Sequence, residues 1–476
     1  MMNYYNHVVV FICSVIYLFF IAYFLKESVN FILLAPCLLA IIFMAIYRFN
    51  YVLYIIFFIT PLSIPISELG LDHLGLNFAF PTEPILFGLM LLTIWKLSYN
   101  FKQFRSIFKH PITLVLLFYL FWILITTFTS SMPLVSFKFF LNRVWYVLPL
   151  VFMGVFLFKK PNSISSFVLL YTIALTMVVS YTIIKHANFF FDKHSAHYMM
   201  SPFFNDHTSY GAMIAFFLPF NVALFYVHKN TWIRLLSLVM LLILSIGLIL
   251  SFTRAAWISL FIAFIVFIFL RLKINRVLLF ISPVVLSVML LLFSGSIIKN
   301  LETNKQDSSD NLIEHISSMS NISTDASNME RINRWKCALK MFIEKPLYGW
   351  GPGTYQFQYS SFQLSKDRTI ISSNFGDMGN AHSEYLSALC ETGLIGFLSF
   401  FSLVLVIVIR AINMYYTANN RTDSIWLLAI VTALISYFIH GLLNNFLDTD
   451  KASVAIWCCV SILIAIDLLN NKKQPI

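Results

Sequence analysis

Long apolar runs recur along almost the whole chain, and short polar connections separate them. A helix that crosses a membrane needs about 20 mostly apolar residues, and about fourteen runs fit this pattern. They are residues 7–25, 29–46, 50–66, 83–97, 111–129, 143–158, 164–184, 209–227, 232–251, 255–271, 277–297, 392–410, 424–444 and 452–470. Two of these runs, 50–66 and 83–97, are short or broken by proline. The pattern therefore predicts an all-α polytopic membrane protein with about 12–14 transmembrane helices.

Composition agrees with this reading. Hydrophobic residues make up 59% of the chain and charged residues 11%, whereas a soluble domain has about 25% charged residues. These values exclude a soluble domain. The first residues, MMNYYNH, lack the basic segment of a secretory signal, so we expect residues 7–25 to remain as a membrane helix.

Lysine and arginine are concentrated in alternate connections. The richer set contains Arg48, Lys96, Lys102, Arg105, Lys109, Lys159, Lys160, Lys229, Arg234, Arg271, Lys273, Arg276, Arg410, Arg421, Lys472 and Lys473. The poorer set contains Lys26, Lys138, Arg143, Lys185, Lys193, Arg254 and Lys451. Because cytoplasmic loops carry the excess of basic residues, both termini are predicted to be cytoplasmic. The same distribution explains the net charge of +11, so no nucleic-acid partner is expected.

One long polar insertion divides the chain into three parts. We expect a transmembrane bundle of about eleven spans over residues 1–297, a large outer loop over 298–391, and C-terminal transmembrane helices over 392–476. Within the loop, MERINRWKCALKMFIEKPLYGWG shows helical periodicity. Its apolar positions predict an amphipathic helix at the membrane interface, with one stripe formed by Ile332, Trp335, Ala338, Leu339 and Phe342.

Several arginines are predicted on the outer side, where they could hold a phosphate. Lys138 and Arg143 lie at a membrane entry, Arg254 lies between two apolar runs, and Arg331 and Arg334 lie in the large loop. A guanidinium binds phosphate oxygens bidentately, so these residues suit a lipid diphosphate. An arginine at a membrane boundary can equally extend to lipid headgroups, and position alone does not decide between these readings for Arg254.

A histidine in the large loop is the candidate base. His382 lies in GNAHSEYLSALCETGLIGF, where Asn380 is predicted to cap a helix and Gly393 to end or bend it. Imidazole can take a proton from a hydroxyl near neutral pH. Several arginines and one histidine therefore make a minimal site without a metal. By itself, the segment also fits a polar capping sequence with an incidental histidine.

Other polar groups give weaker signals. His186, His194, His197 and His207 share an outer loop, but neither a cysteine nor a carboxylate set completes a zinc site. We therefore expect no metal and no cofactor. The last outer loop is crowded with polar residues that could orient His382, bind sugar or simply face solvent: His440, Asn444, Asn445, Asp448 and Asp450.

The spacing His382-Ser383, nine residues, Gly393, two residues, Gly396 resembles the signature of the O-antigen ligase and Wzy polymerase superfamily, which includes bacterial protein O-oligosaccharyltransferases. Three further segments, FFNDHTSYGAMIAFFLP, LSFTRAAWISL and RWKCALKMFIEKPLYGWGPGTY, resemble family segments in the same order. The resemblance covers residues 200–400 well and the N-terminal half only by hydropathy.

This resemblance implies a metal-free, nucleotide-free inverting glycosyltransferase of the bacterial inner membrane, with its active site facing the periplasm. The donor would be an undecaprenyl-diphosphate-linked glycan, and the acceptor a lipid A–core or another lipid-linked glycan. Arg254 would bind the diphosphate and His382 would deprotonate the acceptor hydroxyl. Arg143 and Arg331 or Arg334 would be further phosphate contacts. Asp206, His207 and Tyr385 are further candidates for substrate binding, and the roles of Asp206 and His207 stay open.

Three alternatives stay open. A single large outer loop late in the chain favours an O-antigen ligase, while a Wzy-type polymerase joining lipid-linked repeats uses the same site logic. A lipid-linked glycan transporter would need polar residues along a central cavity, and most spans here are almost purely apolar. A metal-dependent glycosyltransferase would need paired carboxylates, for which only Glu68 and Asp72 offer a weak candidate.

Overall fold

The computed structural model describes residues 35–69, 78–274, 326–364 and 379–471. Contacts divide the chain into two units, residues 1–55 and 56–476, and the site lies within the second. The predicted spans 7–25 and 277–297 fall outside the described residues. Within the described part the architecture is helical, which confirms the predicted all-α membrane fold.

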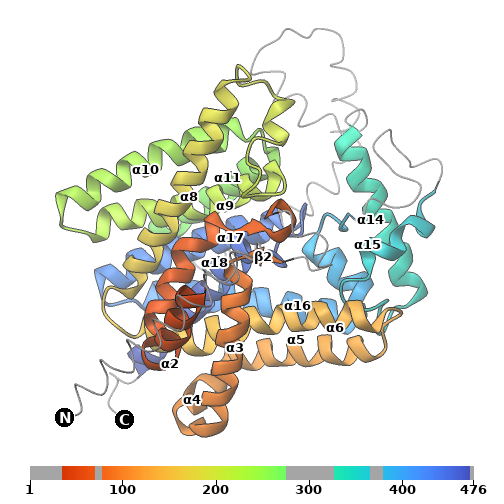
Figure 1. Ribbon diagram of the computed structural model, residues 1–476, viewed down its shortest axis with the longest axis horizontal. Coiled ribbons are helices and arrows are strands. Elements are labelled where there is room, and N and C mark those ends of the chain that lie inside the picture. Colours follow the sequence, from red (N-terminus) through yellow and green to blue (C-terminus); the bar gives the residue numbers. More distant parts are fainter. Residues whose placement is uncertain (1–34, 70–77, 275–325, 365–378, 472–476) are drawn as a thin grey trace, which may run out of the picture. The chain divides into compact units, whose positions relative to one another are not determined.

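Ten described helical segments are long and apolar enough to cross a membrane, or eleven if a bent pair is counted as one. The bent pair consists of α3 (Thr82–Tyr99) and α4 (Phe101–Phe108), which meet at 103°. The other spans are formed by α2 (Ala35–Ile59), α5 (Pro111–Phe128), α6 (Pro133–Val147) with α7 (Gly154–Phe158), α8 (Ser163–Ala187), α9 (His207–Val227), α10 (Thr231–Leu250), α11 (Arg254–Arg271), α16 (Glu384–Thr417), α17 (Arg421–His440) and α18 (Asp450–Asn471) (Figure 1).

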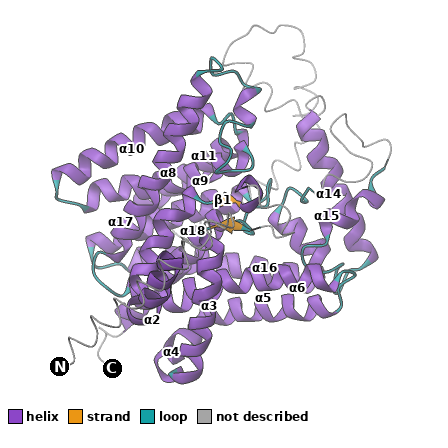
Figure 2. Cartoon of the chain, in the orientation of Figure 1, coloured by secondary structure: helices purple, strands orange, loops and turns teal. Residues whose placement is uncertain are grey.

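The remaining described elements are short. Two-residue strands β1 (Ile64–Pro65) and β2 (Ala79–Phe80) pair antiparallel, with Ile64 opposite Phe80 (Figure 2). The single turns are η2 (Thr60–Leu62), η3 (Ile66–Leu69), η6 (Ser195–His197) and η7 (Tyr359–Phe362). The insertion contributes α14 (Ala326–Glu344) and α15 (Tyr355–Gln358).

Side-chain caps fix where several spans begin. The Asp206 carboxylate accepts hydrogen bonds from the backbone N–H groups of Thr208 and Ser209, at 2.8 and 2.7 Å. Asn230 and Asn420 cap α10 and α17 in the same way. These caps satisfy N–H groups that a helix start leaves without intrahelical partners.

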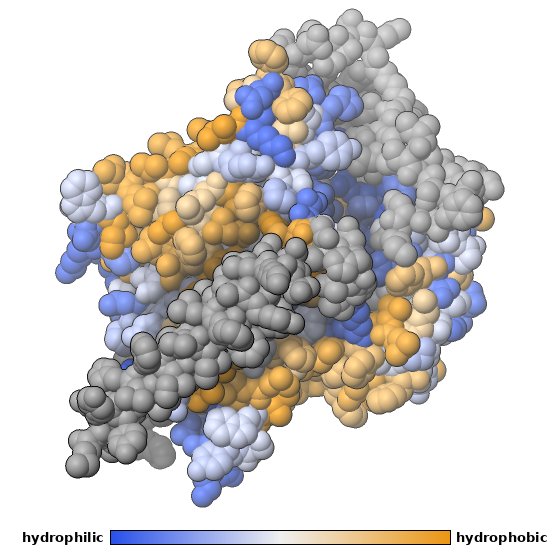
Figure 3. All heavy atoms as spheres, in the orientation of Figure 1, coloured by the Kyte–Doolittle hydropathy of each residue, from blue (hydrophilic) through white to orange (hydrophobic). Residues whose placement is uncertain are grey.

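Packing separates central from peripheral spans. Helix α17 contacts α9, α11 and α16, and α16 also contacts α5 and α14. In α18 the most apolar window is 83% buried, whereas in α10 it is 28% buried. The outer face of α10 is hydrophobic in Figure 3, which suits contact with lipid.

Two span boundaries differ from the sequence prediction. Residues 29–46 and 50–66 were expected as separate spans, but α2 continues through Arg48, where its backbone leaves helical geometry. The span expected at 143–158 begins at Pro133 and continues through a π-helical segment, η5 (Leu148–Met153). Arg143 therefore lies within α6, where an ion pair with Asp448 accommodates its charge.

The structure forms a helix, α14, where the sequence predicts an amphipathic helix. In α14 the buried residues are Glu330, Asn333, Arg334, Cys337, Ala338 and Met341, while Leu339 of the predicted stripe is 44% exposed. Glu330 and Arg334 form a buried ion pair, 2.9 Å apart. Hydropathy alone does not indicate such a pair.

Helix α16 begins inside the predicted outer loop and bends at Gly393, as the sequence indicated. Gly393 has φ 70° and ψ −173°, and the N–H of Leu394 donates to the carbonyl of Pro346 at 2.8 Å. A Cβ placed on Gly393 would lie 2.1 Å from the carbonyl oxygen of Leu347. Only glycine fits this backbone angle and this close approach.

We expect Gly393→Ala to destabilise the protein by at least about 2 kcal/mol, because positive φ and overpacking both carry a cost. Thermal unfolding in detergent measures the effect. The matched control is Gly88→Ala in α3, where an added Cβ meets no atom within 4 Å. Equal stability of the two variants would contradict the assigned packing.

Candidate active site

His382 lies just before α16 in a left-handed backbone conformation, with φ 49°. Its N–H donates to the Asn380 side-chain oxygen at 3.0 Å, and its carbonyl accepts from the Trp335 indole N–H at 3.2 Å. Ser383 caps α16 by accepting from the N–H of Leu386. The predicted cap, Asn380, therefore holds the backbone of His382 and does not cap the helix.

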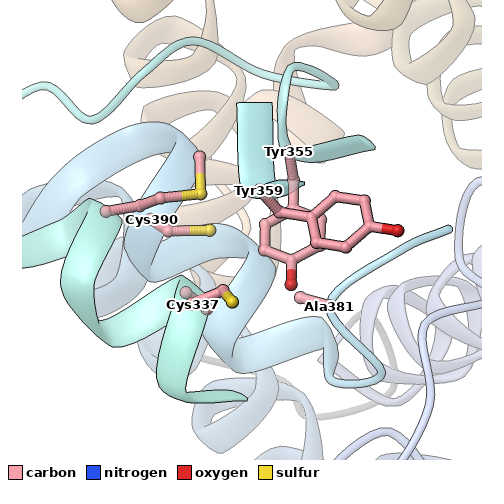
Figure 4. Packing of buried hydrophobic residues seen from close by; sticks show 7 residues of the cluster. Cys337, Tyr355, Tyr359, Ala381 and Cys390 are labelled. Carbon is pink, nitrogen blue, oxygen red and sulfur yellow. The ribbon is translucent and has the colours of Figure 1, made fainter. Parts of the chain in front are cut away.

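A hydrophobic cluster packs against the segment that carries His382. Ala381 packs into it with Cys337, Cys390, Tyr355 and Tyr359 (Figure 4). The two tyrosine rings stack with centroids 5.1 Å apart. Burial of the residue directly before the histidine restricts how far His382 can move.

Arg334 connects this cluster to the histidine segment. Its guanidinium pairs with Glu330, donates to the carbonyl of Asn380 at 3.1 Å and lies over the ring of Tyr359. The side chain is 5% exposed. Arg334 thus positions the His382 segment through several contacts.

The loop between α17 and α18, residues 441–449, is bound to the start of α16; we call it the last loop. One oxygen of the Glu384 carboxylate accepts from the N–H groups of Phe446 and Leu447, at 2.8 and 2.7 Å. The same oxygen accepts from the Tyr437 hydroxyl at 3.0 Å. The N–H of Glu384 donates to the carbonyl of Gly441 at 2.9 Å. The two segments therefore form one unit.

Arg143 holds the other side of the last loop. Its guanidinium donates to the carbonyl of Leu447 at 2.9 Å and pairs with Asp448 at 2.5 Å. Asn142 donates to the carbonyl of Asp448. The predicted phosphate contact Arg143 is therefore engaged with the protein itself.

Polar residues from five segments meet beside this unit. They form what we call the histidine cluster: His207, Arg331, His382, His440 and Asn444. The Asn444 amide nitrogen lies 3.0 Å from Nε2 of His440. The charge of Arg331 acts on all three histidines.

Arg254 lies at the edge of the histidine cluster, as the first residue of α11. The Thr253 hydroxyl donates to the carbonyl of His207 at 2.7 Å, which ties the turn before α11 to the start of α9. The backbone of Ala255 interacts with the His440 ring. These contacts bring the start of α11 to the end of α17.

The environment keeps His382 uncharged. Burial, followed by the charges of Arg334 and Arg331, lowers the pKa of His382 to about 3, and Asp206 and Asn444 offset only part of this shift. At neutral pH the imidazole therefore has a free lone pair and can accept a proton.

A cleft of about 560 Å³ lies next to the histidine cluster. Asp206 and Asn380, which both interact with His382, form part of its lining. Its carboxylates outnumber its lysines: Glu83, Asp206, Glu391, Asp448 and Asp450 face only Lys138 and Lys451. Trp145 and Phe139 add aromatic surface. Such a mixture of hydrogen-bonding groups and aromatic rings suits a sugar.

Comparison with known proteins identifies this part of the chain. Residues 239–401 match the family model described as O-antigen ligase. This match supports the resemblance of residues 239–401 to the O-antigen ligase-like superfamily. The matched range contains Arg254, Arg331 and His382, while His207 and Asn444 lie outside it.

A second comparison adds a relative without assigned function. The chain is 26% identical over 125 residues to an uncharacterized protein of Haemophilus influenzae. The match covers 26% of this chain and 30% of that protein. It therefore carries no information about substrate.

The structure brings together only some of the predicted site residues. His382, His207 and Arg331 belong to the histidine cluster, Asp206 lines the adjoining cleft, and Arg254 lies at the edge. The Tyr385 side chain contacts residues outside the histidine cluster. Its hydroxyl donates to the carbonyl of Phe438 at 3.2 Å, and its ring packs on Phe400.

Two residues of the site were not singled out by sequence reasoning. Glu384, inside the signature motif, binds the last loop, and Asn444 was one of several polar residues whose role stayed open. Among the described residues, no group of three or more histidine, cysteine or carboxylate side chains is placed to hold a metal. His186, from the proposed zinc set, instead bonds to the carbonyl of Asp192 at 2.8 Å.

We expect Arg331→Gln to raise the pKa of His382 above about 3, because a nearby positive charge that disfavours the imidazolium is removed. NMR titration of labelled histidine in a detergent micelle or nanodisc measures this pKa. Arg234→Gln is the control, since Arg234 lies over the ring of Phe225, between α9 and α10. An unchanged His382 titration in Arg331→Gln would refute the assigned proximity.

Proposed function

We propose that the protein transfers a glycan from undecaprenyl diphosphate to a hydroxyl of lipid A–core, as an O-antigen ligase. The family match supports ligase- or polymerase-type chemistry. The observation that carries the proposal is an uncharged, half-buried histidine beside an arginine, within the matched domain.

The donor's diphosphate would bind at Arg331 and Arg254. Guanidinium groups bind phosphate oxygens bidentately and stabilise the charge that develops on a leaving diphosphate. Arg334 pairs with Glu330 and Arg143 with Asp448, so both act as supports for the surrounding segments. The proposal therefore assigns two arginines, Arg331 and Arg254, to the donor's diphosphate.

His382 would act as the general base. The acceptor hydroxyl gives its proton to the free imidazole nitrogen as its oxygen attacks the anomeric carbon. The bond from that carbon to the diphosphate oxygen breaks on the opposite face, which inverts the configuration. The bound diphosphate also offsets the charges of Arg331 and Arg334, so it raises the pKa of His382 towards a useful range for proton transfer.

The cleft would hold sugar residues of a substrate. Its volume of about 560 Å³ lies in the usual range for a ligand site. Its carboxyl and amide groups can accept hydrogen bonds from the hydroxyls of a sugar. Asp206 and Asn380 then place this sugar close to His382.

All of these groups lie at one end of the bundle. They belong to the set of connections between spans that is poor in lysine and arginine. These connections contact one another: the N–H of Ser131 donates to the carbonyl of Trp350, and the Asn380 side chain donates to the carbonyl of Asn445. Lysine and arginine are concentrated in the other connections. The positive-inside rule therefore supports a periplasmic site and cytoplasmic termini.

We expect His382→Ala and Arg254→Ala each to lower transfer by at least about 100-fold, because each removes a group that acts in the transition state. The assay is lipopolysaccharide gel analysis in a strain whose own copy is deleted. His194→Ala, at an exposed histidine, is the control and should restore wild-type chains. Full activity of both site variants, with normal insertion, would refute the site.

The same strain separates ligase from polymerase. Long glycans accumulating on the lipid carrier, with bare lipid A–core, indicate a ligase. Lipid A–core that carries only single repeats indicates a polymerase and would contradict the proposed acceptor.

A further inference from the structure

Helix α4 lies at the end of the bundle opposite to the histidine cluster. The His110 ring, two residues after α4, lies 2.9 Å from the Asp467 carboxylate of α18. Helix α18 begins at Asp450, which lines the cleft beside the histidine cluster. The helical rise from Asp450 to Asp467 is about 26 Å. The hydrocarbon core of a bilayer is roughly 30 Å thick, so we expect α4 at the other membrane surface.

Exposed aromatic residues mark the level of this surface. Trp95 and Tyr99, near the end of α3, and Phe101, the first residue of α4, are all more than half exposed. The rings of Trp95 and Tyr99 stack with centroids 6.2 Å apart. Tryptophan and tyrosine are enriched at the headgroup level of membranes, because their rings are apolar and carry one polar group. The end of α3 therefore fits the membrane interface.

Helix α4 turns away from α3 at this level, with an angle of 103° between the two helices (Figure 1). Its apolar side faces the protein, because Phe104 and Ile107 are buried and the Phe104 ring meets the edge of Phe156 at 5.0 Å. A short amphipathic helix that lies across the direction of a membrane span fits a position along the membrane surface.

The other side of α4 is basic. Lys102, Arg105 and Lys109 are exposed, and residues three and four apart are neighbours on a helix surface. Figure 3 shows hydrophilic surface where α4 lies. In the part of the chain that the structure describes, no carboxylate forms an ion pair with these three side chains. Their charges are therefore available to an anionic partner.

A second basic connection lies beside α4. Lys159 and Lys160 follow α7, and Nζ of Lys159 lies 5.6 Å from the ring centroid of Phe156. The same ring contacts Phe104 of α4. Basic residues from the two connections therefore gather in what we call the basic patch: Lys102, Arg105, Lys109, Lys159 and Lys160.

We propose that the basic patch binds the headgroups of anionic phospholipids, such as phosphatidylglycerol, in the leaflet opposite the histidine cluster. Each lysine or arginine near an anionic bilayer surface strengthens binding by a factor of about five. The exposed rings of Trp95 and Tyr99 beside the patch favour a lipid surface over an acidic soluble protein, because a bilayer covers these rings. The proposal is independent of the role of His382.

The test is native mass spectrometry of the delipidated full-length protein, titrated with phosphatidylglycerol or with phosphatidylcholine. The unchanged protein should bind phosphatidylglycerol at least about 10-fold more tightly, because only this headgroup has a net negative charge. The double variant Lys102→Gln, Arg105→Gln should lose most of this preference and keep its affinity for phosphatidylcholine. The matched control is Lys193→Gln with Lys336→Gln, which removes the same charge at two other exposed positions and should keep the preference.

Three results would overturn the proposal. Equal affinity of the unchanged protein for both lipids would do so, and would leave the basic patch to an acidic protein partner. An equal loss of preference in the variant and the control would show an effect of net charge alone. A titration of the unchanged protein with ammonium acetate needs no variant: salt should weaken phosphatidylglycerol binding, and an affinity that does not depend on salt would contradict the proposal.

Discussion

The contact between the Glu384 carboxylate and the last loop determines the geometry of the rest of the site. A buried carboxylate is costly unless hydrogen bonds replace its water. Here one oxygen accepts from two backbone N–H groups and the Tyr437 hydroxyl. Separating the loop from α16 would leave these groups without partners, so the two move together. His382 precedes Glu384 by two positions, and Asn444 lies within the bound loop.

Buried charges explain why the predicted arginines divide into two kinds. Arg143 pairs with Asp448 beneath the last loop, and Arg334 pairs with Glu330 beneath the histidine segment. Removing either partner of the fully buried Arg334–Glu330 pair leaves an uncompensated buried charge, which costs about 3–5 kcal/mol. Arg331 differs in that its charge reaches three histidines. Arg143 and Arg334 thereby support the site, and the proposal assigns the donor's diphosphate to Arg331 and Arg254.

Much of the fold could be predicted from the sequence, because a bilayer requires long apolar helices with satisfied backbones. Predictions failed where a tertiary contact outweighed hydropathy. The span predicted from residue 143 begins at Pro133, and Arg143 and Arg334 are buried in ion pairs that hydropathy does not indicate. The bend at Gly393 could be predicted, since glycine spacing is visible in the sequence.

The site was only partly predictable for the same reason. His382 and Arg331 lie in recognisable segments, and the proposed catalytic roles depend on them. Asn444 lies in a polar loop without periodicity. No feature of the sequence distinguishes it from its polar neighbours Asn445 and Asp448. Glu384 reads as an ordinary acidic residue at a helix start. Only the path of the last loop shows what these two residues contact.

The most direct test of the account reconstitutes the purified protein in liposomes with undecaprenyl-diphosphate glycan and lipid A–core, with a chelator present. The account predicts that each glycan joined to lipid A–core releases one undecaprenyl diphosphate and carries an inverted anomeric linkage. Movement of the lipid-linked glycan across the bilayer without a new glycosidic bond, or transfer that stops when metal is removed, would contradict it.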